Sequence, residues 1–487
     1  MKRALAFDLG ASSGRAILGT LGDGKIGMEE VHRFSNDPVI VNGTMYWDTL
    51  RQFYEIKQGI SRAKGYGGFE SIGIDTWGVD FGLLDAHGDL LESGVHYRDD
   101  RTQGMIGKVF AKIPEERLYE ITGNEFMYFN TIFQMEALKE KRPWLLERAD
   151  KFLFTPDLFN YLLTGEQKCE YTMATTSSMF DLRRKKWSRE VMDALGLSES
   201  LFPEIIESGT VVGTLKQEIC DELAVTPKKV IAVASHDTQS ASVAVPTQEE
   251  DFIFISCGTW SLYGTELPGP VIGRKSLKLA VTNEGSYGGR VNFLKNITGL
   301  WMIQESRRQW IREGQTYSFG ELEDLAGEAR PFESYIDVNA SEFVPAGDMP
   351  GRIRKYCQET DQPIPETVGE IVRCIDQSLA LRYRRVLEQI QSCLDKSYHR
   401  IHMIGGGIQS RLLCQMTANA TGCEVVAGPV EATALGNLVV QFMALGEIRD
   451  IREARAIIAR SEQMTVYKPE DTAAWERAYE EFKRCLR

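Results

Sequence analysis

Short hydrophobic runs separated by turn residues open the chain, a pattern typical of strands that pair with their neighbours. Extended runs cover residues 4–9, 15–21 and 25–34. The second and third runs are joined by Gly-Asp-Gly at residues 22–24, and an aspartate–glycine pair between extended runs is a strong hairpin signal. We therefore predict three successive strands, with residues 10–14 as a tight turn between the first two.

A similar arrangement recurs near the middle of the chain. An apolar run at residues 252–255 is followed by a turn rich in Gly, Thr and Ser and by a second extended run. Gly10 of the first turn and Gly258 of this one are separated by roughly half the chain length. A polar stretch precedes the second copy, as is typical of a boundary. We predict two related domains that cover residues 1–245 and 246–487.

Between these turns, strand-like and helix-like segments alternate. Apolar residues recur every three or four positions over residues 371–390, which predicts a helix with one buried face. The other predicted elements are strands over residues 71–75, 79–85, 230–234 and 401–404, and helices over residues 239–245, 408–420 and 435–443. Strands and helices that alternate in two halves predict an α/β fold.

The composition is that of a folded, water-soluble protein. Hydrophobic residues make up 43% of the chain, which is enough for a core and excludes intrinsic disorder of the whole chain. The net charge of −13 disfavours binding to nucleic acid or to anionic membranes. No apolar run approaches the roughly 18 residues of a membrane span, and the N-terminus lacks the apolar core of a signal peptide.

The nine cysteines are scattered and include no Cys-x-x-Cys pair, which is typical of reduced thiols in a reducing compartment. We therefore expect a cytoplasmic protein. Cys357 and Cys374, on either side of a proline-containing loop, are the only pair that we consider for a disulfide bridge. His399 and His402 lack the further spacing of a zinc-ligand set, so no zinc site is expected.

The turn at residues 10–15, Gly-Ala-Ser-Ser-Gly-Arg, has the chemistry of a phosphate-binding loop. Small residues leave backbone N–H groups and two hydroxyls open to an anion, and Arg15 adds a charged donor. Asp8, at the end of the preceding strand, is placed to hold hydrated Mg²⁺. The alternative is an ordinary hairpin turn, since the chain has no P-loop motif.

Two further turns in the second half offer similar donors. Gly258 and Thr259 present a backbone N–H and a hydroxyl. Residues 405–407 are a glycine run between a strand and a helix, where unpaired N–H groups and the helix dipole favour phosphate. Each turn alone is weak evidence. Together with the turn in the first half, they predict a triphosphate held between two domains.

Asp237 is the candidate for proton transfer. It lies between the predicted strand at residues 230–234 and the predicted helix at residues 239–245. Its carboxylate can cap the helix as an N-cap or accept a proton from a hydroxyl nucleophile, and it can do both if each oxygen has one task. His236 beside it can bond a sugar hydroxyl or can be structural, and the sequence leaves both alternatives open.

Aromatic and charged residues near strand ends form a candidate wall for a sugar. Residues 74–80, Ile-Asp-Thr-Trp-Gly-Val-Asp, place a Trp and a Gly between two carboxylates, although the same residues can serve the core and the turn. Residues 98–101, Arg-Asp-Asp-Arg, predict either a solvated ion-pair surface or a reader of sugar hydroxyls. Asn296 and Gln304 are expected on one helix.

These segments together resemble the FGGY family of carbohydrate kinases, over nearly the full chain from about Leu5 to beyond Asn437. The segments that carry the resemblance are residues 8–15, 235–238, 258–260, 405–407 and 428–437. Within the family, the chain is most similar to members that phosphorylate L-rhamnulose. That closer similarity is carried by residues 73–81, 97–99, 155–157, 282–285 and 295–297.

The resemblance implies two actin-like domains of the ribonuclease H type, with ATP and sugar in the cleft between them. The activity implied is ATP-dependent phosphorylation of the 1-hydroxyl of L-rhamnulose, giving L-rhamnulose 1-phosphate and ADP in L-rhamnose catabolism. The cofactors are then ATP and Mg²⁺, and the partners are L-rhamnulose and ATP. No nucleic acid, membrane or obligatory protein partner is expected.

The resemblance also assigns residues to the site. Asp237 is implied as the proton acceptor, and Asp8 stays the expected Mg²⁺ contact, through water. The implied ATP contacts are Ala11, Ser12, Ser13, Gly14, Arg15, Thr259, Gln304 and Gly406. The implied sugar contacts are Gly78, His236, Asp237, Thr238 and Asn296.

Two positions depart from the family pattern: Ser410, where relatives often carry Asn, and Cys257, where Ser is common. Both affect contacts near ATP rather than the reaction. Three alternatives stay open, namely a kinase of L-fuculose or another ketose, an ATP-dependent regulator of the actin superfamily without catalysis, and a plain sugar-binding module. Asp8 and Asp237 argue against the regulator, and three phosphate turns argue against the binding module.

Overall fold

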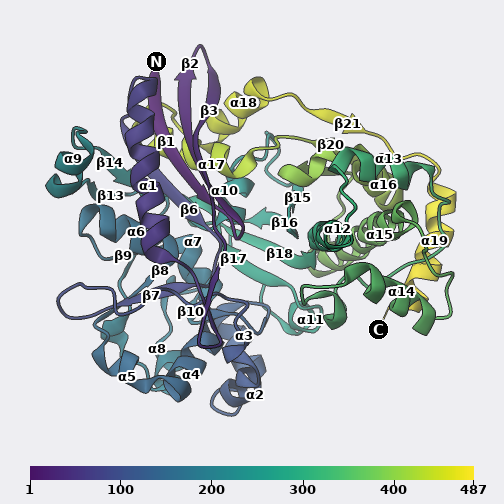
Figure 1. Ribbon diagram of the computed structural model, residues 1–487, viewed down its shortest axis with the longest axis horizontal. Helices are drawn as coiled ribbons and strands as arrows, with labels where there is room; N and C mark the ends of the chain where they lie inside the picture. Colours follow the sequence, from purple (N-terminus) through teal and green to yellow (C-terminus); the bar gives the residue numbers. More distant parts are fainter. Residues whose placement is uncertain (487) are drawn as a thin grey trace. The chain divides into compact units, whose positions relative to one another are not determined.

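The computed structural model describes residues 1–486, which form two compact units (Figure 1). Unit 1 comprises Met1–Gln248, Glu266–Phe293 and Ala432–Ser461, and the described part of unit 2 comprises Glu249–Thr265, Leu294–Glu431 and residues 462–486. Each unit therefore combines segments that are far apart in the sequence. The predicted domains of residues 1–245 and 246–487 stay a prediction.

Unit 1 is built on a six-stranded sheet of order β13-β14-β6-β1-β2-β3. Its strands are β1 (Lys2–Leu9), β2 (Ser13–Gly22), β3 (Lys25–Ser35), β6 (Ser71–Thr76), β13 (Val211–Thr214) and β14 (Lys229–Ile231). β2 is antiparallel to β1 and β3, whereas β6 is parallel to both β1 and β14. The three predicted N-terminal strands, purple in Figure 1, are thus confirmed.

Smaller elements complete unit 1. Its other strands are β4 (Val39–Val41), β5 (Thr44–Tyr46), β7 (Phe81–Leu84), β8 (Lys151–Phe154), β9 (Lys168–Glu170), β10 (Phe180–Asp181), β11 (Lys186–Trp187), β12 (Glu204–Ile206) and β17 (Thr282–Gly285). Its helices are α1 (Thr49–Ala63), α2 (Met105–Phe110), α3 (Glu115–Thr122), α4 (Thr131–Lys141), α5 (Pro143–Arg148), α6 (Thr155–Thr164), α7 (Tyr171–Ala174), α8 (Arg189–Leu195), α9 (Gln217–Leu223), α10 (Asp237–Val243), α11 (Arg274–Lys278), α17 (Ala432–Ala444) and α18 (Ile451–Ser461).

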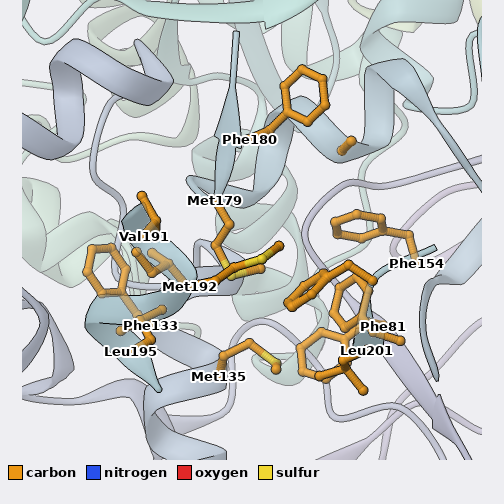
Figure 2. Packing of buried hydrophobic residues seen from close by; sticks show 14 of the residues in the cluster. Phe81, Phe133, Met135, Phe154, Met179, Phe180, Val191, Met192, Leu195 and Leu201 are labelled. Carbon is orange, nitrogen blue, oxygen red and sulfur yellow. The ribbon is translucent and has the colours of Figure 1, made fainter. Parts of the chain in front are cut away.

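A hydrophobic cluster of unit 1 packs α4 and α8 against the β7–β8 ribbon (Figure 2). Phe81 of β7 lies against Phe152 of β8, with ring centroids 4.7 Å apart. Met135 and Leu195 belong to the same cluster, and all of these side chains are buried. Their burial, worth about 1.5–3 kcal/mol for each large side chain, fixes the chain that follows residues 77–80.

Helix α17 is anchored to the sheet of unit 1 by buried polar groups. Gln441 Nε2 donates to the carbonyl of Leu5 at 3.1 Å, and Ser71 Oγ donates to Gln441 Oε1 at 2.7 Å. One turn earlier in the helix, Asn437 Nδ2 donates to Asp75 Oδ2 at 2.6 Å. Since each of these side chains is fully buried, a lost partner would leave a polar group without water, at a cost of about 1–3 kcal/mol.

Unit 2 contains a second sheet, in which β16 (Trp260–Leu267), β15 (Ile253–Cys257), β19 (Arg400–Ile404), β20 (Glu424–Ala427) and β21 (Thr465–Tyr467) are neighbours in that order. β18 (Val291–Thr298) ends in this unit. Its helices are α12 (Trp301–Arg312), α13 (Phe319–Glu328), α14 (Met349–Glu359), α15 (Val368–Leu394), α16 (Arg411–Thr421) and α19 (Thr472–Cys485). The predicted helix over residues 371–390 is confirmed as α15, whose capping box of Thr367 and Glu370 marks its start.

Several predicted elements differ from the observed ones. Asn296 and Gln304 do not share a helix: Asn296 lies on β18 and Gln304 on α12. Gly299, which lies in the break between these two elements, is the signal that separates them. The strand predicted at residues 230–234 is shorter, and the helix predicted from residue 408 begins at Arg411, after a 3₁₀ turn.

Candidate active site

The turn between β1 and β2 is a tight loop that is braced from the side. Gly10 N–H donates to the Ser13 carbonyl at 2.9 Å, and Asn36 Nδ2 donates to the Gly10 carbonyl at 2.7 Å. Ser12 at the tip is exposed, which leaves room for an anion. Packing also requires glycine at position 14, because a Cβ there would lie 2.2 Å from the Phe34 ring.

Charged groups gather beside this turn at the ends of β1 and β6. Arg15 donates to Asp8 Oδ2 at 2.5 Å, and Asp8 stands opposite Asp75 in the parallel pairing of the two strands. Asp75 is fully buried, and its Oδ1 has no hydrogen-bond partner among the described residues. Burial, together with the charge of Asp8, raises the pKa of Asp75 well above its usual range.

Asp237 is the first residue of α10, and His236 rather than Asp237 is the N-cap. The carboxylate of Asp237 nevertheless accepts one helix N–H, from Thr238 at 2.6 Å, on Oδ1. Its side chain is about one-third exposed, at 34%. Burial of its surroundings raises the pKa of Asp237, although the charge of His236 opposes that shift. The carboxylate is thus both held and reachable, as a proton acceptor requires.

His236 and Thr238 flank Asp237 on the same short segment. His236 pairs with Thr76, the last residue of β6, and the His236 N–H donates to Thr172 Oγ1 at 3.2 Å. Thr238 Oγ1 donates to Asp237 Oδ1 at 3.2 Å. These contacts fix the segment before α10 against the end of β6.

Gly78 lies against the imidazole of His236. A Cβ at Gly78 would come within 3.3 Å of His236 Nε2 and 3.2 Å of Thr176 Cγ2. The next residue, Val79, has a φ of 67°, which is strained for a β-branched side chain. The strain is held by Thr131 Oγ1, which donates to the Val79 carbonyl at 2.8 Å.

Asp80 organises the aromatic residues of the predicted sugar wall. Its Oδ2 accepts the indole N–H groups of Trp47 at 2.6 Å and Trp77 at 2.9 Å, and the Tyr97 N–H at 3.0 Å. Gln134 donates to its Oδ1 at 3.0 Å. Both Asp80 and Trp77 are buried, so they belong to the supporting core of this wall rather than to its open face.

The segment at residues 98–101 is not a surface of solvated ion pairs. Asp99 is buried and accepts backbone N–H groups, from Met45 at 2.8 Å and from Arg101 at 2.9 Å. The guanidinium of Arg98 lies 5.4 Å from the centre of the Tyr97 ring, and Arg101 donates to Gln134. The segment is therefore joined to the same aromatic cluster as Asp80.

In unit 2, Thr259 and Gln304 lie together. Thr259 Oγ1 donates to Gln304 Oε1 at 3.2 Å, and the Trp301 N–H at the start of α12 donates to the Thr259 carbonyl at 3.2 Å. Asn296 is half-buried on β18, where its carbonyl accepts the Asn339 side chain at 3.4 Å.

The glycine run packs on Cys257. A Cβ at Gly407 would lie 2.3 Å from Cys257 Sγ, whereas Gly406 is exposed and a Cβ there meets nothing within 4 Å. Burial raises the pKa of the Cys257 thiol to about 11, so it stays protonated at neutral pH. Ser410 caps α16 through a hydrogen bond from the Leu413 N–H at 3.1 Å.

Two contacts of the site were not anticipated from the sequence. Glu284 on β17 lies 3.2 Å from His236 Nδ1, and Asn437 holds Asp75. Both join residues that are distant along the chain, so no local spacing signals them.

All nine cysteines are free thiols, and Cys357 and Cys374 form no bridge in this structure.

The described residues, 1–486, contain no group of three His, Cys, Asp or Glu side chains arranged to hold a metal ion directly. None of their helices is long and apolar enough to cross a membrane.

Two family models match the chain. The N-terminal domain of the FGGY family of carbohydrate kinases matches residues 3–244, and the C-terminal domain of the same family matches residues 253–445.

Curated relatives match along nearly their whole length. A rhamnulokinase of Bacteroides thetaiotaomicron is 43% identical over 483 residues, which is 99% of each chain. A rhamnulokinase of Oceanobacillus iheyensis is 44% identical over 95% of this chain and 97% of its own. One of Bacillus subtilis is 38% identical over 96% of this chain and 95% of its own.

Solved structures share the fold at low sequence identity. A ligand-bound xylulose kinase from Lactobacillus acidophilus superposes with a TM-score of 0.82 at 18% identity, covering 99% of this chain and 97% of the other. Plasmodium falciparum glycerol kinase with ADP gives a TM-score of 0.79 at 15% identity, over 99% and 98%. The expected α/β fold of two actin-like domains is thereby confirmed. With both family domains matched in order and near-complete coverage of curated members, the chain belongs to the FGGY family of carbohydrate kinases.

Proposed function

We propose that this carbohydrate kinase transfers the γ-phosphoryl group of ATP to the 1-hydroxyl of L-rhamnulose, giving L-rhamnulose 1-phosphate and ADP in L-rhamnose catabolism. The observation that carries the proposal is the similarity to rhamnulokinases at 38–44% identity over 95–100% of this chain. As an FGGY kinase the chain uses ATP.

The contacts proposed for ATP come from three turns. Residues 11–15, Ala-Ser-Ser-Gly-Arg, would meet its phosphates, and the exposed tip of that turn supports this assignment. Thr259 and Gln304 already form a pair, and Gly406 is open to solvent. Exposed N–H and hydroxyl donors on small residues suit a phosphate or a ribose.

The contacts proposed for the sugar centre on Asp237. His236 and Thr238 lie close to the Asp237 carboxylate, and Gly78 lies against the His236 ring. This proximity supports a shared role of these residues at the sugar. Asn296 is assigned to the sugar by the family resemblance alone.

In the proposed reaction Asp237 orients the 1-hydroxyl and accepts its proton as the oxygen–phosphorus bond forms. The bond from the γ-phosphorus to the bridging oxygen of ADP breaks in the same displacement, so charge is conserved. Such transition states are loose, and catalysis therefore depends on positioning and on neutralising phosphate charge. Arg15, about one-fifth exposed and already bonded to Asp8, is the cation of the first turn for that task.

Asp8 and Asp75 fit the chemistry of a magnesium site. Their carboxylates stand side by side at the strand ends, and Asp75 Oδ1 is a buried acceptor without a partner. Mg²⁺ favours one or two carboxylates and keeps several waters, which agrees with the lack of a complete protein ligand set. Asp8 would hold the hydrated ion through water, and the ion would supply neutralisation of phosphate charge.

The proposal extends to the setting of the enzyme. Nine free thiols and a need for ATP favour the cytoplasm, and L-rhamnulose and ATP are the partners proposed. Nucleic acid, membranes and an obligatory protein partner are not part of the proposal. The domain division at residue 245 is proposed as the boundary of the two family domains.

The decisive assay measures ADP release with Mg-ATP and a panel of L-rhamnulose, L-fuculose, L-ribulose, L-xylulose and glycerol, with a control that lacks sugar. We expect turnover selective for L-rhamnulose, and ³¹P and ¹³C spectra that place the phosphate on carbon 1. Selective turnover of another sugar would keep the transfer chemistry and overturn the assigned substrate. Folded protein that binds ATP without sugar-dependent ADP release would favour the regulator instead.

A further inference from the structure

The imidazole of His236 lies between two carboxylates. Its Nδ1 is 3.2 Å from Glu284 Oε2, and its Nε2 is 3.4 Å from Asp237 Oδ1. His236 and Glu284 are both buried, at 9% and 7% exposure. The three side chains come from β17, from the segment before α10 and from α10 itself. They form a row from Glu284 through His236 to Asp237.

Glu284 is held at its end of the row. Gln239 Nε2 donates to Glu284 Oε2 at 2.8 Å, and Gln239 Oε1 accepts from Asn292 Nδ2 at 2.5 Å. The strand that carries Glu284 is also fixed, since the Gly285 N–H donates to Thr175 Oγ1 at 2.8 Å. A carboxylate with so little freedom can dictate the orientation of the ring it meets.

The protons of the imidazole follow from its neighbours. An ionised carboxylate can only accept hydrogen bonds, so the nitrogen that faces Glu284 must carry a proton. The nitrogen that faces Asp237 meets a second acceptor, and it too must carry a proton if Asp237 is ionised. The row then holds an imidazolium between two carboxylates, which is a favourable charge arrangement in a buried place.

Other charges around His236 point the same way. The groups that face the ring are Glu284 on β17, Asp237 on α10 and Glu170 at the end of β9. Burial by itself lowers the pKa of His236. The close contact and charge of Glu284, followed by the charges of Asp237 and Glu170, outweigh burial and raise the pKa of His236 above its ordinary value.

The donors on Asp237 gather on one oxygen. Oδ1 accepts from the Thr238 N–H at 2.6 Å and from Thr238 Oγ1 at 3.2 Å, and it is the oxygen that faces His236. Oδ2 is therefore the oxygen left for a substrate hydroxyl. Its lone pairs keep their direction because the donors on Oδ1 fix the rotation of the carboxylate.

We propose that Glu284 is a positioning residue for phosphoryl transfer: it holds His236 as an imidazolium that orients Asp237 through Oδ1, and so presents Oδ2 to the sugar hydroxyl. The proposal rests on the function proposed above, because it gives Glu284 a task in that reaction. Glu284 acts through His236 and does not itself contact the reacting atoms.

Glu284→Gln isolates the charge of this residue. Gln239 donates to Glu284 Oε2, and His236 Nδ1 lies 3.2 Å from the same oxygen, so an amide oxygen in that position keeps both contacts and removes only the negative charge. Glu136→Gln is the matched control. Glu136 is also a buried carboxylate of unit 1, but it lies on α4 and pairs with Lys112.

The first readout does not depend on activity. The chain has six histidines, so ¹⁵N spectra of the imidazole rings can be followed against pH, with His236→Asn used to assign one set of signals. We expect His236 to stay protonated to a higher pH in the wild type and in Glu136→Gln than in Glu284→Gln. An unchanged titration of His236 in Glu284→Gln would overturn the proposal.

The second readout is the pH profile of kcat with L-rhamnulose and ATP. Without the Glu284 charge, the imidazolium loses its proton at a lower pH, so the alkaline limb of the kcat profile should move to lower pH. At the pH optimum, kcat should fall by less than the roughly 100-fold that is the minimum for removal of a general base. A merely structural role would lower stability without moving this limb. If Glu284→Gln does not fold, Glu284→Asp, which retracts the carboxylate by one methylene, takes its place in both measurements.

The two proposals fail separately. If the wild type does not phosphorylate L-rhamnulose, the substrate is wrong, while the ring titration still decides whether Glu284 sets the charge of His236. If L-rhamnulose is phosphorylated and neither the titration nor the alkaline limb moves in Glu284→Gln, the function stands and the role of Glu284 is refuted.

Discussion

Trp47 and Trp77 lie ring against ring, with centroids 4.0 Å apart and planes tilted by 32°, and both indoles donate to the same oxygen of Asp80. His96 also stacks on Trp47, with a centroid distance of 4.0 Å. One buried carboxylate thus fixes two aromatic residues that support the predicted sugar wall at residues 74–80. Its ionisation must affect the stability of this wall.

We predict a pH-dependent stability from Asp80. Burial raises the pKa of Asp80 to about 6, although the hydrogen-bond donors around it favour the charged form. The folded chain therefore binds a proton on Asp80 more tightly than the unfolded chain does. The stability it contributes is fully present below pH 4 and is lost as pH rises through 6. The loss is on the order of 3 kcal/mol at about 1.4 kcal/mol per pKa unit.

Asp80→Asn removes this titration. Urea unfolding is followed by tryptophan fluorescence at pH 4, 5, 6 and 7. The unfolding free energy of the variant should increase relative to that of the wild type as pH rises, apart from a constant difference that the amide introduces. A difference in unfolding free energy that stays constant over this range would contradict the prediction.

Asp237→Asn should abolish most of the turnover and leave the fold intact. An amide cannot accept the hydroxyl proton, and a general base contributes about 10²–10⁴-fold, so kcat should fall at least about 100-fold at unchanged Tm. Asp193→Asn, at an exposed position of α8, serves as the control and should keep wild-type kinetics. Near-normal kcat in Asp237→Asn would refute the assignment of the base.

Gly78→Ala should weaken sugar binding selectively. The added methyl would press on Thr176 and on the His236 ring at 3.2 and 3.3 Å, and one methyl group in a binding wall changes affinity about 10-fold or more. We expect KM for L-rhamnulose to rise while KM for ATP stays within about twofold. Gly27→Ala, whose methyl meets nothing within 4 Å, is the control, and an equal rise in both KM values would show a general disturbance instead.

Gly436→Ala should destabilise unit 1 strongly. A Cβ there would lie 1.7 Å from the Ser240 carbonyl oxygen, so α17 would have to move away from α10. Overpacking against a backbone costs about 1–3 kcal/mol, and we expect the upper end of this range in chemical unfolding. Gly107→Ala, in helix α2 with open space around its Cβ, should be neutral or slightly stabilising. Equal midpoints for the two variants would contradict this account.

Local pattern was sufficient for much of unit 1 and for the long helix. The strands β1, β2 and β3 follow from apolar runs with Gly-Asp-Gly between them, because that turn chemistry has few other solutions. Helix α15 follows from its apolar period. The turn at Gly10 follows likewise from the glycines and serines between two extended runs.

Elements and contacts without a local sequence signal are predicted less accurately than these strands and this helix. Asn296 and Gln304 lie eight residues apart with Trp301 between them, which predicts one helix, whereas β18 ends at Thr298 and α12 begins only at Trp301. The contacts of Glu284 with His236 and of Asn437 with Asp75 are tertiary. Charge and burial bring these side chains together only after β17 and α17 have docked, so spacing along the chain carries no trace of them.

The place of α17 in unit 1 has a consequence for synthesis. Gln441 bonds the carbonyl of Leu5 across 436 positions of the sequence, so β1 obtains one of its packing partners last of all. At roughly 5–20 residues per second, a ribosome completes α17 about 10–40 s after residue 248. Until then the face of the sheet that α17 covers stays open, so unit 1 completes its packing only after most of unit 2 has been synthesised.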